Sequence, residues 1–165
     1  MCGFVGYIPS AGATQNHQLI VKAMADKIKH RGPDSDGYYV DDNVALGFRR
    51  LSIIDLSENG SQPFYSEDGQ VVLVFNGEIY NFLALREELE MLGHKFVSKT
   101  DSEVVLRGYE AWGKKVLTRL RGMFGFAIWD GRKKTALVAR DPFGIKPVYY
   151  GEASKDGTIF FGSEI

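Results

Sequence analysis

The alternation of apolar and polar residues predicts many short strands with a few helices between them. Apolar runs of three to six residues are separated by pairs such as Asp68-Gly69, Asp130-Gly131 and Asp156-Gly157, which suit tight turns. Residues 124–140, centred on Asp130-Gly131, are a hairpin candidate. The predicted strands cover residues 3–8, 38–40, 45–48, 71–75, 124–129, 136–139, 147–150 and 159–161.

Three other segments have helical periodicity. Residues 16–29 form the first, and Gly32-Pro33 ends it. Asn81 can cap the second, and Thr100 with Glu103 forms a capping box for the third. Because strands outnumber helices and tight turns join neighbouring strands, the pattern favours an α+β fold of mainly antiparallel sheets covered by helices. The apolar helix faces that we expect to be buried are Ile20, Ala23, Met24 and Ile28, then Phe82, Leu85, Leu89 and Leu92, then Val104, Val105, Tyr109 and Trp112.

Composition narrows the class of protein. The chain has 165 residues and a net charge of −1, which argues against a partner such as nucleic acid or an anionic membrane. Its apolar runs are far shorter than the roughly 18 residues of a membrane-spanning helix, and no basic residue precedes Lys22, as a secretory signal would require. A single cysteine excludes an intrachain disulfide. We expect no metal site, because the three histidines, His17, His30 and His94, are too widely spaced in the sequence. We expect one cytoplasmic domain.

Cys2 is the sharpest candidate for chemistry. Removal of Met1 would give this residue a free α-amino group, and such groups have an ordinary pKa of about 7.7–8.0, suited to a base at neutral pH. Nucleophilic thiol and base would then belong to one residue. On position alone, a small buried residue at the start of a strand is the commoner explanation.

Three further features each have a structural and a functional explanation. Asn76-Gly77 is either a type I′ hairpin turn or, with a side-chain amide beside a Gly N–H, an oxyanion hole. Arg49-Arg50 ends a strand, where one guanidinium could clamp a carboxylate, although a solvated arginine is commoner. Asp101 lies in the first turn of a helix, where the helix dipole favours a carboxylate in any case.

Taken together, a series of motifs follows in order along the chain: Met1-Cys2-Gly3, His30-Arg31-Gly32-Pro33-Asp34, Arg50-Leu51-Ser52-Ile53-Ile54-Asp55, Gln62-Pro63, Phe75-Asn76-Gly77-Glu78-Ile79-Tyr80-Asn81, Thr100-Asp101-Ser102-Glu103, residues 122–127 and residues 140–147. Over residues 1–165 they resemble the class II glutamine amidotransferase domain, in the variant of glutamine-hydrolysing asparagine synthetase. The resemblance implies an N-terminal-nucleophile hydrolase fold, a four-layer αββα sandwich of two mainly antiparallel sheets.

The resemblance also implies a reaction, in which glutamine and water give glutamate and ammonia through a thioester on Cys2. The Asn76 amide and the Gly77 N–H would hold the oxyanion. The implied substrate-binding residues are Arg50 for the α-carboxylate, Glu78 and Asp101 for the α-ammonium group, and Leu51, Ser52, Ile53 and Ile54 along the pocket.

The family's C-terminal synthetase domain has no counterpart here, because nothing matches its Ser-Gly-Gly-type pyrophosphate loop. ATP and Mg²⁺ are therefore implied only for that absent domain, and no cofactor for this one. The expected partners are L-glutamine and the synthetase domain, and the surface left bare by the missing domain favours a homo-oligomer. Two alternatives stay open: an amidotransferase domain for another acceptor, and a non-catalytic glutamine-binding or synthetase-docking module, which retention of Met1 would favour.

Overall fold

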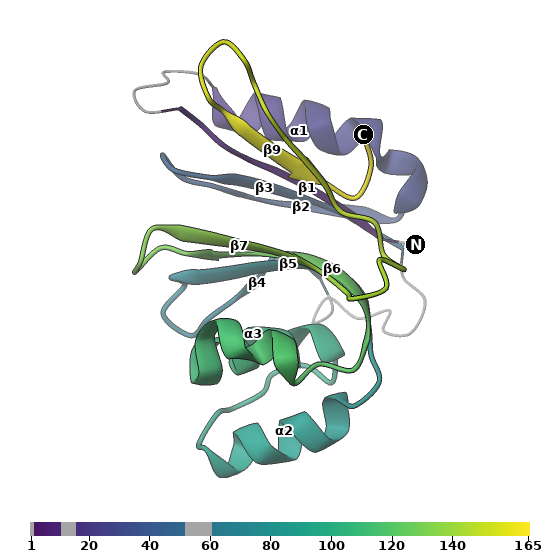
Figure 1. Cartoon of the computed structure of the whole chain (residues 1–165), viewed down its shortest axis with the longest axis vertical. Helices are drawn as coiled ribbons and strands as arrows, with labels where there is room; N and C mark the ends of the chain where they lie inside the picture. Colours follow the sequence, from purple (N-terminus) through teal and green to yellow (C-terminus); the bar gives the residue numbers. More distant parts are fainter. Residues whose placement is uncertain (1, 11–15, 52–60) are drawn as a thin grey trace.

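A computed structural model describes residues 2–10, 16–51 and 61–165, and arranges them in four layers (Figure 1). The layers are α1, a first sheet, a second sheet, and then α2 with α3. None of the helices in these ranges is long and apolar enough to cross a membrane. The elements are β1 (Gly3–Ile8), α1 (His17–Lys27), η1 (Lys29–Arg31), β2 (Ser35–Val40), β3 (Ala45–Arg50), β4 (Phe64–Tyr65), β5 (Val71–Ile79), α2 (Phe82–Met91), α3 (Asp101–Trp112), η3 (Gly113–Thr118), β6 (Gly122–Asp130), β7 (Thr135–Arg140), β8 (Tyr149–Glu152) and β9 (Ile159–Gly162).

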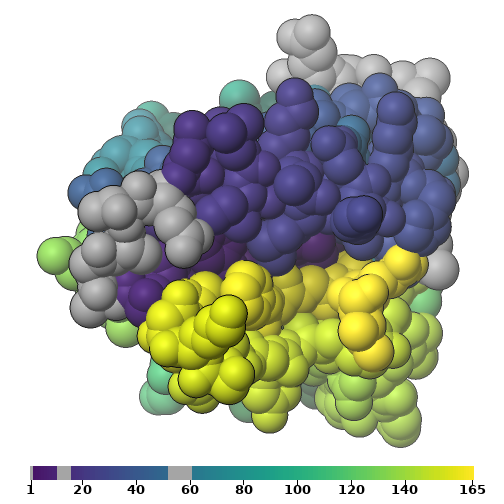
Figure 2. Space-filling model, turned by 90° about the horizontal axis from the view of Figure 1, so that it is seen from above, coloured from purple at the N-terminus to yellow at the C-terminus, as the bar shows by residue number. Residues whose placement is uncertain are grey.

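Both sheets are antiparallel throughout the part of the chain that the structure describes. The first has the strand order β2-β3-β1-β9-β8, and the second has the order β4-β5-β6-β7. Strand β9 returns beside β1, so that the C-terminal residues, yellow in Figure 2, lie against the N-terminal strand. The predicted α+β sandwich is confirmed.

Successive residues of the central strands face different layers. In β1, Phe4 packs between the two sheets, whereas Val5 packs against α1. In β5, Val74 packs between the sheets and Phe75 packs toward α2 and α3. Both faces of these strands are therefore buried, which explains why they are continuous apolar runs in the sequence. The same period of two assigns each polar residue at a strand end to a face.

All the predicted strands are present, but the one expected over residues 147–150 is shifted to β8, Tyr149–Glu152. One extension matters for the site. Strand β5 does not end at Phe75 but continues through Asn76 and Gly77 to Ile79, paired with β6 along its whole length. The hairpin-turn explanation of Asn76-Gly77 is therefore wrong. The short strand β4 was not predicted, since two residues carry no periodicity.

The predicted helices are confirmed, but one cap, half of the capping box and parts of two apolar faces are not. Thr100 caps α3 by accepting a hydrogen bond from the Glu103 N–H at 3.4 Å. The Glu103 carboxylate does not return the bond, because it accepts from the Val97 and Ser98 N–H groups instead. Asn81 precedes α2 without capping it, because its side chain bonds the Arg119 carbonyl and the Arg121 N–H instead. Two residues expected to be buried, Ala23 and Leu92, are exposed.

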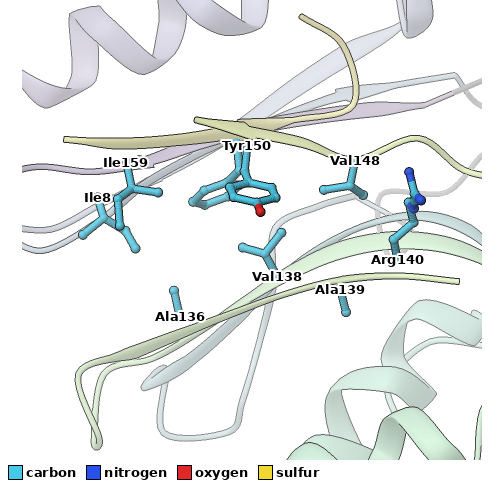
Figure 3. A pocket seen from close by; sticks show the side chains of 9 residues that line it. Ile8, Ala136, Val138, Ala139, Arg140, Val148, Tyr150 and Ile159 are labelled. Atoms are coloured by element: carbon cyan, nitrogen blue, oxygen red, sulfur yellow. The ribbon is translucent and has the colours of Figure 1, made fainter. Parts of the chain in front are cut away.

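A groove of about 600 Å³ opens between the sheets beside β7 and β8 (Figure 3). Its lining contains no carboxylate or thiol, and none of the residues that the sequence predicts for the active site belongs to it. The candidate active site therefore lies elsewhere. The lining residues are Ile8, Ala136, Val138, Ala139, Arg140, Val148, Tyr150, Ile159 and Phe161.

Candidate active site

The thiol of Cys2 lies on the inner face of the first sheet, at the start of β1. Cys2 is two residues before Phe4 and, like it, packs against the apolar cluster between the sheets. Its Sγ accepts a hydrogen bond from the Leu51 N–H at 3.4 Å and lies 3.6 Å from the Leu51 carbonyl oxygen. The thiol is partly buried. The sulfur therefore lies between a main-chain donor and a main-chain acceptor of Leu51, which together fix its position.

The two arginines at the end of β3 have different environments. Arg49 lies on the α1 side, where its Nε donates to the Ala25 carbonyl at 3.1 Å and its guanidinium pairs with Asp26 and with Asp36. Arg50 follows the inner-facing Phe48 by two residues, and its Nη1 donates to Ser61 Oγ at 3.3 Å. Arg50 is thus on the same side of the sheet as Cys2, which is what the sequence prediction for it requires.

Asn76 is on the inner face of the second sheet, two residues after Val74. It is buried, and within the described part of the chain its Nδ2 has no hydrogen-bond partner. Opposite it in β6 is Gly125, where an added Cβ would lie 3.6 Å from the Phe4 ring, so β1 approaches the second sheet here. The N-terminus and the end of β5 lie at the same end of the sandwich (Figure 1). An unused amide donor therefore lies at the end of the sandwich that holds the thiol.

Gly77 is required by close packing against β6 and not by a turn. A Cβ at this position would lie 2.3 Å from the Met123 carbonyl oxygen and 2.7 Å from Phe124 Cα. These are main-chain atoms of a paired strand, so they cannot move aside cheaply. The absence of a side chain lets the main chain of β5 run flat against β6 beside Asn76.

Two carboxyl groups meet where β5 ends and α3 begins. Asp101 accepts a hydrogen bond from the Ile79 N–H at 2.8 Å. Burial raises the pKa of Asp101, that hydrogen bond opposes the rise, and the charge of Glu78 adds to it. Two neighbouring acids, both partly buried, form a place where a cationic group is stabilised.

Of the remaining predicted pocket residues, Leu51 contacts the Cys2 sulfur through its main chain. Ser52, Ile53 and Ile54 lie outside the described residues, so their predicted role stays a prediction.

Two residues support the site although the sequence analysis gave them no role. Gln62 bonds both main-chain groups of Phe75, donating to its carbonyl at 3.0 Å and accepting from its N–H at 2.6 Å, and so fixes β5 just before Asn76. Arg31 donates from Nε to the carbonyl oxygen of Cys2 at 3.0 Å. Both residues belong to the motifs that the chain shares with the class II amidotransferase domain, and this was the signal that could have identified them. Their contacts join segments that are distant in the sequence, so no local pattern predicts these contacts.

Comparison with known proteins finds relatives that match nearly the whole chain. The chain is 48% identical over 166 residues to asparagine synthetase [glutamine-hydrolyzing] 1 of Bacillus subtilis, covering 99% of this chain and 26% of that protein. It is 37% identical to asparagine synthetase [glutamine-hydrolyzing] 3 of Arabidopsis thaliana, covering 100% of this chain and 28% of that protein. The chain thus spans about a quarter of the length of the curated relatives that it matches.

The fold has solved counterparts at lower identity. Glutamine phosphoribosylpyrophosphate amidotransferase from B. subtilis, in complex with ADP and GMP, superposes with a TM-score of 0.80 at 22% identity. The match covers 99% of this chain and 42% of that one, and it supports the fold alone. A family model described as a glutamine amidotransferase domain matches residues 1–165. With the sandwich, the thiol at the start of β1 and this full-length match in agreement, the chain belongs to the glutamine amidotransferase domain family.

Proposed function

We propose that this domain hydrolyses L-glutamine to glutamate and ammonia with Cys2 as the nucleophile. One observation carries the proposal: the sole cysteine and a buried, unpartnered amide donor, Asn76 Nδ2, lie at one end of the sandwich on facing sheets. Leaving a buried donor without a partner costs about 1–3 kcal/mol. Such a cost is expected where the partner is a group that develops during a reaction.

The proposed reaction needs only protein groups and water. Once Met1 has been removed, the Cys2 α-amine takes the thiol proton and the sulfur attacks the side-chain amide carbon of glutamine. The carbonyl oxygen becomes an oxyanion held by Asn76 Nδ2 and the Gly77 N–H. The amine then passes its proton to the leaving nitrogen, and ammonia departs. Water attacks the resulting γ-glutamyl thioester, releasing glutamate and restoring the thiol.

The amino-acid head of the substrate has matching charges at the same end of the sandwich. We assign the α-carboxylate to Arg50, because it lies on the same face of the first sheet as Cys2, whereas Arg49 lies on the α1 side. We assign the α-ammonium group to Asp101 and Glu78, whose mutual repulsion a cation would relieve. A site whose charges match this head group would discriminate against amides that lack it.

We further propose that the ammonia passes to a synthetase domain of the type named in the relatives, asparagine synthetase [glutamine-hydrolyzing]. ATP and Mg²⁺ would belong to that domain, because the chemistry assigned here uses a thiol, an amine and N–H donors. A nucleophilic thiol that must stay reduced favours a cytoplasmic setting. An acceptor other than aspartate is the alternative within the same class.

Glutamate release tests the proposal. Wild-type protein and Cys2→Ala are incubated with L-glutamine and, separately, with glutaramic acid, which has the same amide but no α-ammonium group. We expect release from glutamine by the wild type only, and little hydrolysis of glutaramic acid. Equal release by both proteins would end the proposal. Thermal unfolding of the variant shows that its fold is intact.

A further inference from the structure

The main chain of Cys2 is held from the α1 side by a group of charged residues. Arg31 of η1 donates from Nε to the Cys2 carbonyl at 3.0 Å and from Nη1 to Glu164 Oε1 at 2.8 Å. The other carboxylate oxygen of Glu164 pairs with His30 Nε2 at 2.9 Å. Glu164 follows β9 by two residues, so a segment remote in the sequence is linked to the main chain of the nucleophile through one guanidinium.

Neighbouring contacts hold the residues just after Cys2. The Ser163 N–H donates to the Phe4 carbonyl at 2.9 Å, and the Phe4 N–H donates to Ser163 Oγ at 3.0 Å. At Gly3 a Cβ would lie 2.9 Å from Arg31 Cδ, so the glycine leaves the space that the arginine side chain occupies. The start of β1 is therefore fixed on this side by residues 163–164 and Arg31.

The Arg31 guanidinium does not use all of its donors. Its side chain is only 9% exposed, and among the residues that the structure describes its Nη2 is buried without a partner. Interactions with Arg31 first, and then with His30, lower the pKa of Glu164, so the carboxylate is ionised at neutral pH. Arg31 thus bonds both an ionised carboxylate and the Cys2 carbonyl, although one of its own donors stays unsatisfied. This combination favours a positioning role for Arg31 over a purely stabilising one.

We propose that Glu164 is a positioning residue for the nucleophile, acting through Arg31 on the carbonyl of Cys2. The inference rests on the proposed function. A residue at the start of a chain has a main-chain neighbour on one side only, so its thiol and α-amine can swing away from the substrate. Fixing its carbonyl restricts that rotation and keeps both groups aligned, and misplacement by about 1 Å can cost 100-fold in rate.

The test compares Glu164→Ala, Glu164→Gln and the matched control Glu87→Gln, an exposed glutamate of α2. In Glu164→Ala we expect kcat for glutamine hydrolysis to fall about tenfold with KM within twofold of wild type. Glu164→Gln keeps an oxygen acceptor for Arg31 and should recover kcat to within about threefold. Glu87→Gln should match the wild type.

Two further measurements separate this proposal from the proposed function. Hydrogen exchange of the peptide covering residues 2–8 should be faster in Glu164→Ala than in Glu164→Gln, whether or not the protein hydrolyses glutamine. Arg31→Lys combined with Glu164→Ala should be no slower than Arg31→Lys alone, because both act on one contact. Wild-type kcat and exchange in a folded Glu164→Ala would overturn the positioning role. Absence of glutaminase activity in the wild type, with faster exchange in that variant, would overturn only the catalytic proposal.

Discussion

Replacing Asn76 by leucine should separate stability from activity. Leucine has a similar volume and removes the buried Nδ2 that has no partner in the structure. An unsatisfied buried donor costs about 1–3 kcal/mol, so its removal should leave the free energy of unfolding unchanged or raise it by about 1 kcal/mol. The same change removes an oxyanion donor, a loss that costs about 2.7–4 kcal/mol of transition-state stabilisation, or 100- to 1000-fold in kcat.

Asn81→Leu provides the matched control. Asn81 donates to the Arg119 carbonyl at 3.0 Å and accepts from the Arg121 N–H at 2.9 Å. Its loss should lower the free energy of unfolding by about 1–2 kcal/mol and leave kcat near the wild-type value. Urea unfolding and glutamate release measure both quantities. If Asn76→Leu lost more than 2 kcal/mol of stability, or kept wild-type kcat, the assignment of its amide as an unpartnered oxyanion donor would be refuted.

Three other substitutions test neighbouring parts of the site. Gly77→Ala would place a Cβ 2.3 Å from a main-chain oxygen and should destabilise by about 1–3 kcal/mol in urea, whereas Gly151→Ala meets nothing within 4 Å and should be neutral. The pKa of Asp101 is raised in the folded protein, so the folded state binds a proton that the unfolded state releases. The free energy of unfolding should therefore fall as the pH rises from the ordinary value of 3.8 toward the raised pKa. Asp101→Asn should remove this pH dependence of stability, stabilise the protein at neutral pH and raise KM for glutamine. Urea unfolding at several pH values measures the dependence, and an unchanged dependence in the variant would contradict the prediction. Arg50→Ala should raise KM for glutamine about tenfold or more, while Arg49→Ala should mainly lower the free energy of unfolding by about 1–3 kcal/mol. A larger KM effect in Arg49→Ala than in Arg50→Ala would contradict the assignment.

The sequence predicted the strands well because their apolar runs are short and bounded by turn pairs. It did not settle the conformation of Asn76-Gly77, because this dipeptide is compatible both with a hairpin turn and with the continuation of a strand. What keeps β5 straight is pairing with β6 and the side chain of Gln62, both of which are contacts between distant segments.

The two arginines show a second limit of sequence reasoning. Strand periodicity separates Arg49 from Arg50, but both faces of β3 are buried, so apolarity alone does not say which face lies toward the other sheet. The Asn81 cap failed for a related reason. Partners about 40 residues away, at Arg119 and Arg121, outcompeted the local helix end for its side chain.

The most direct test of the account is to trap the acyl intermediate on the nucleophile. Protein mixed with L-glutamine is quenched in acid within the first turnover, and intact-mass and peptide analysis locates any γ-glutamyl adduct. The account predicts an adduct on Cys2, in chains from which Met1 has been removed, that decays as glutamate appears. Glutamate release from chains that retain Met1, or an adduct on another residue, would contradict it.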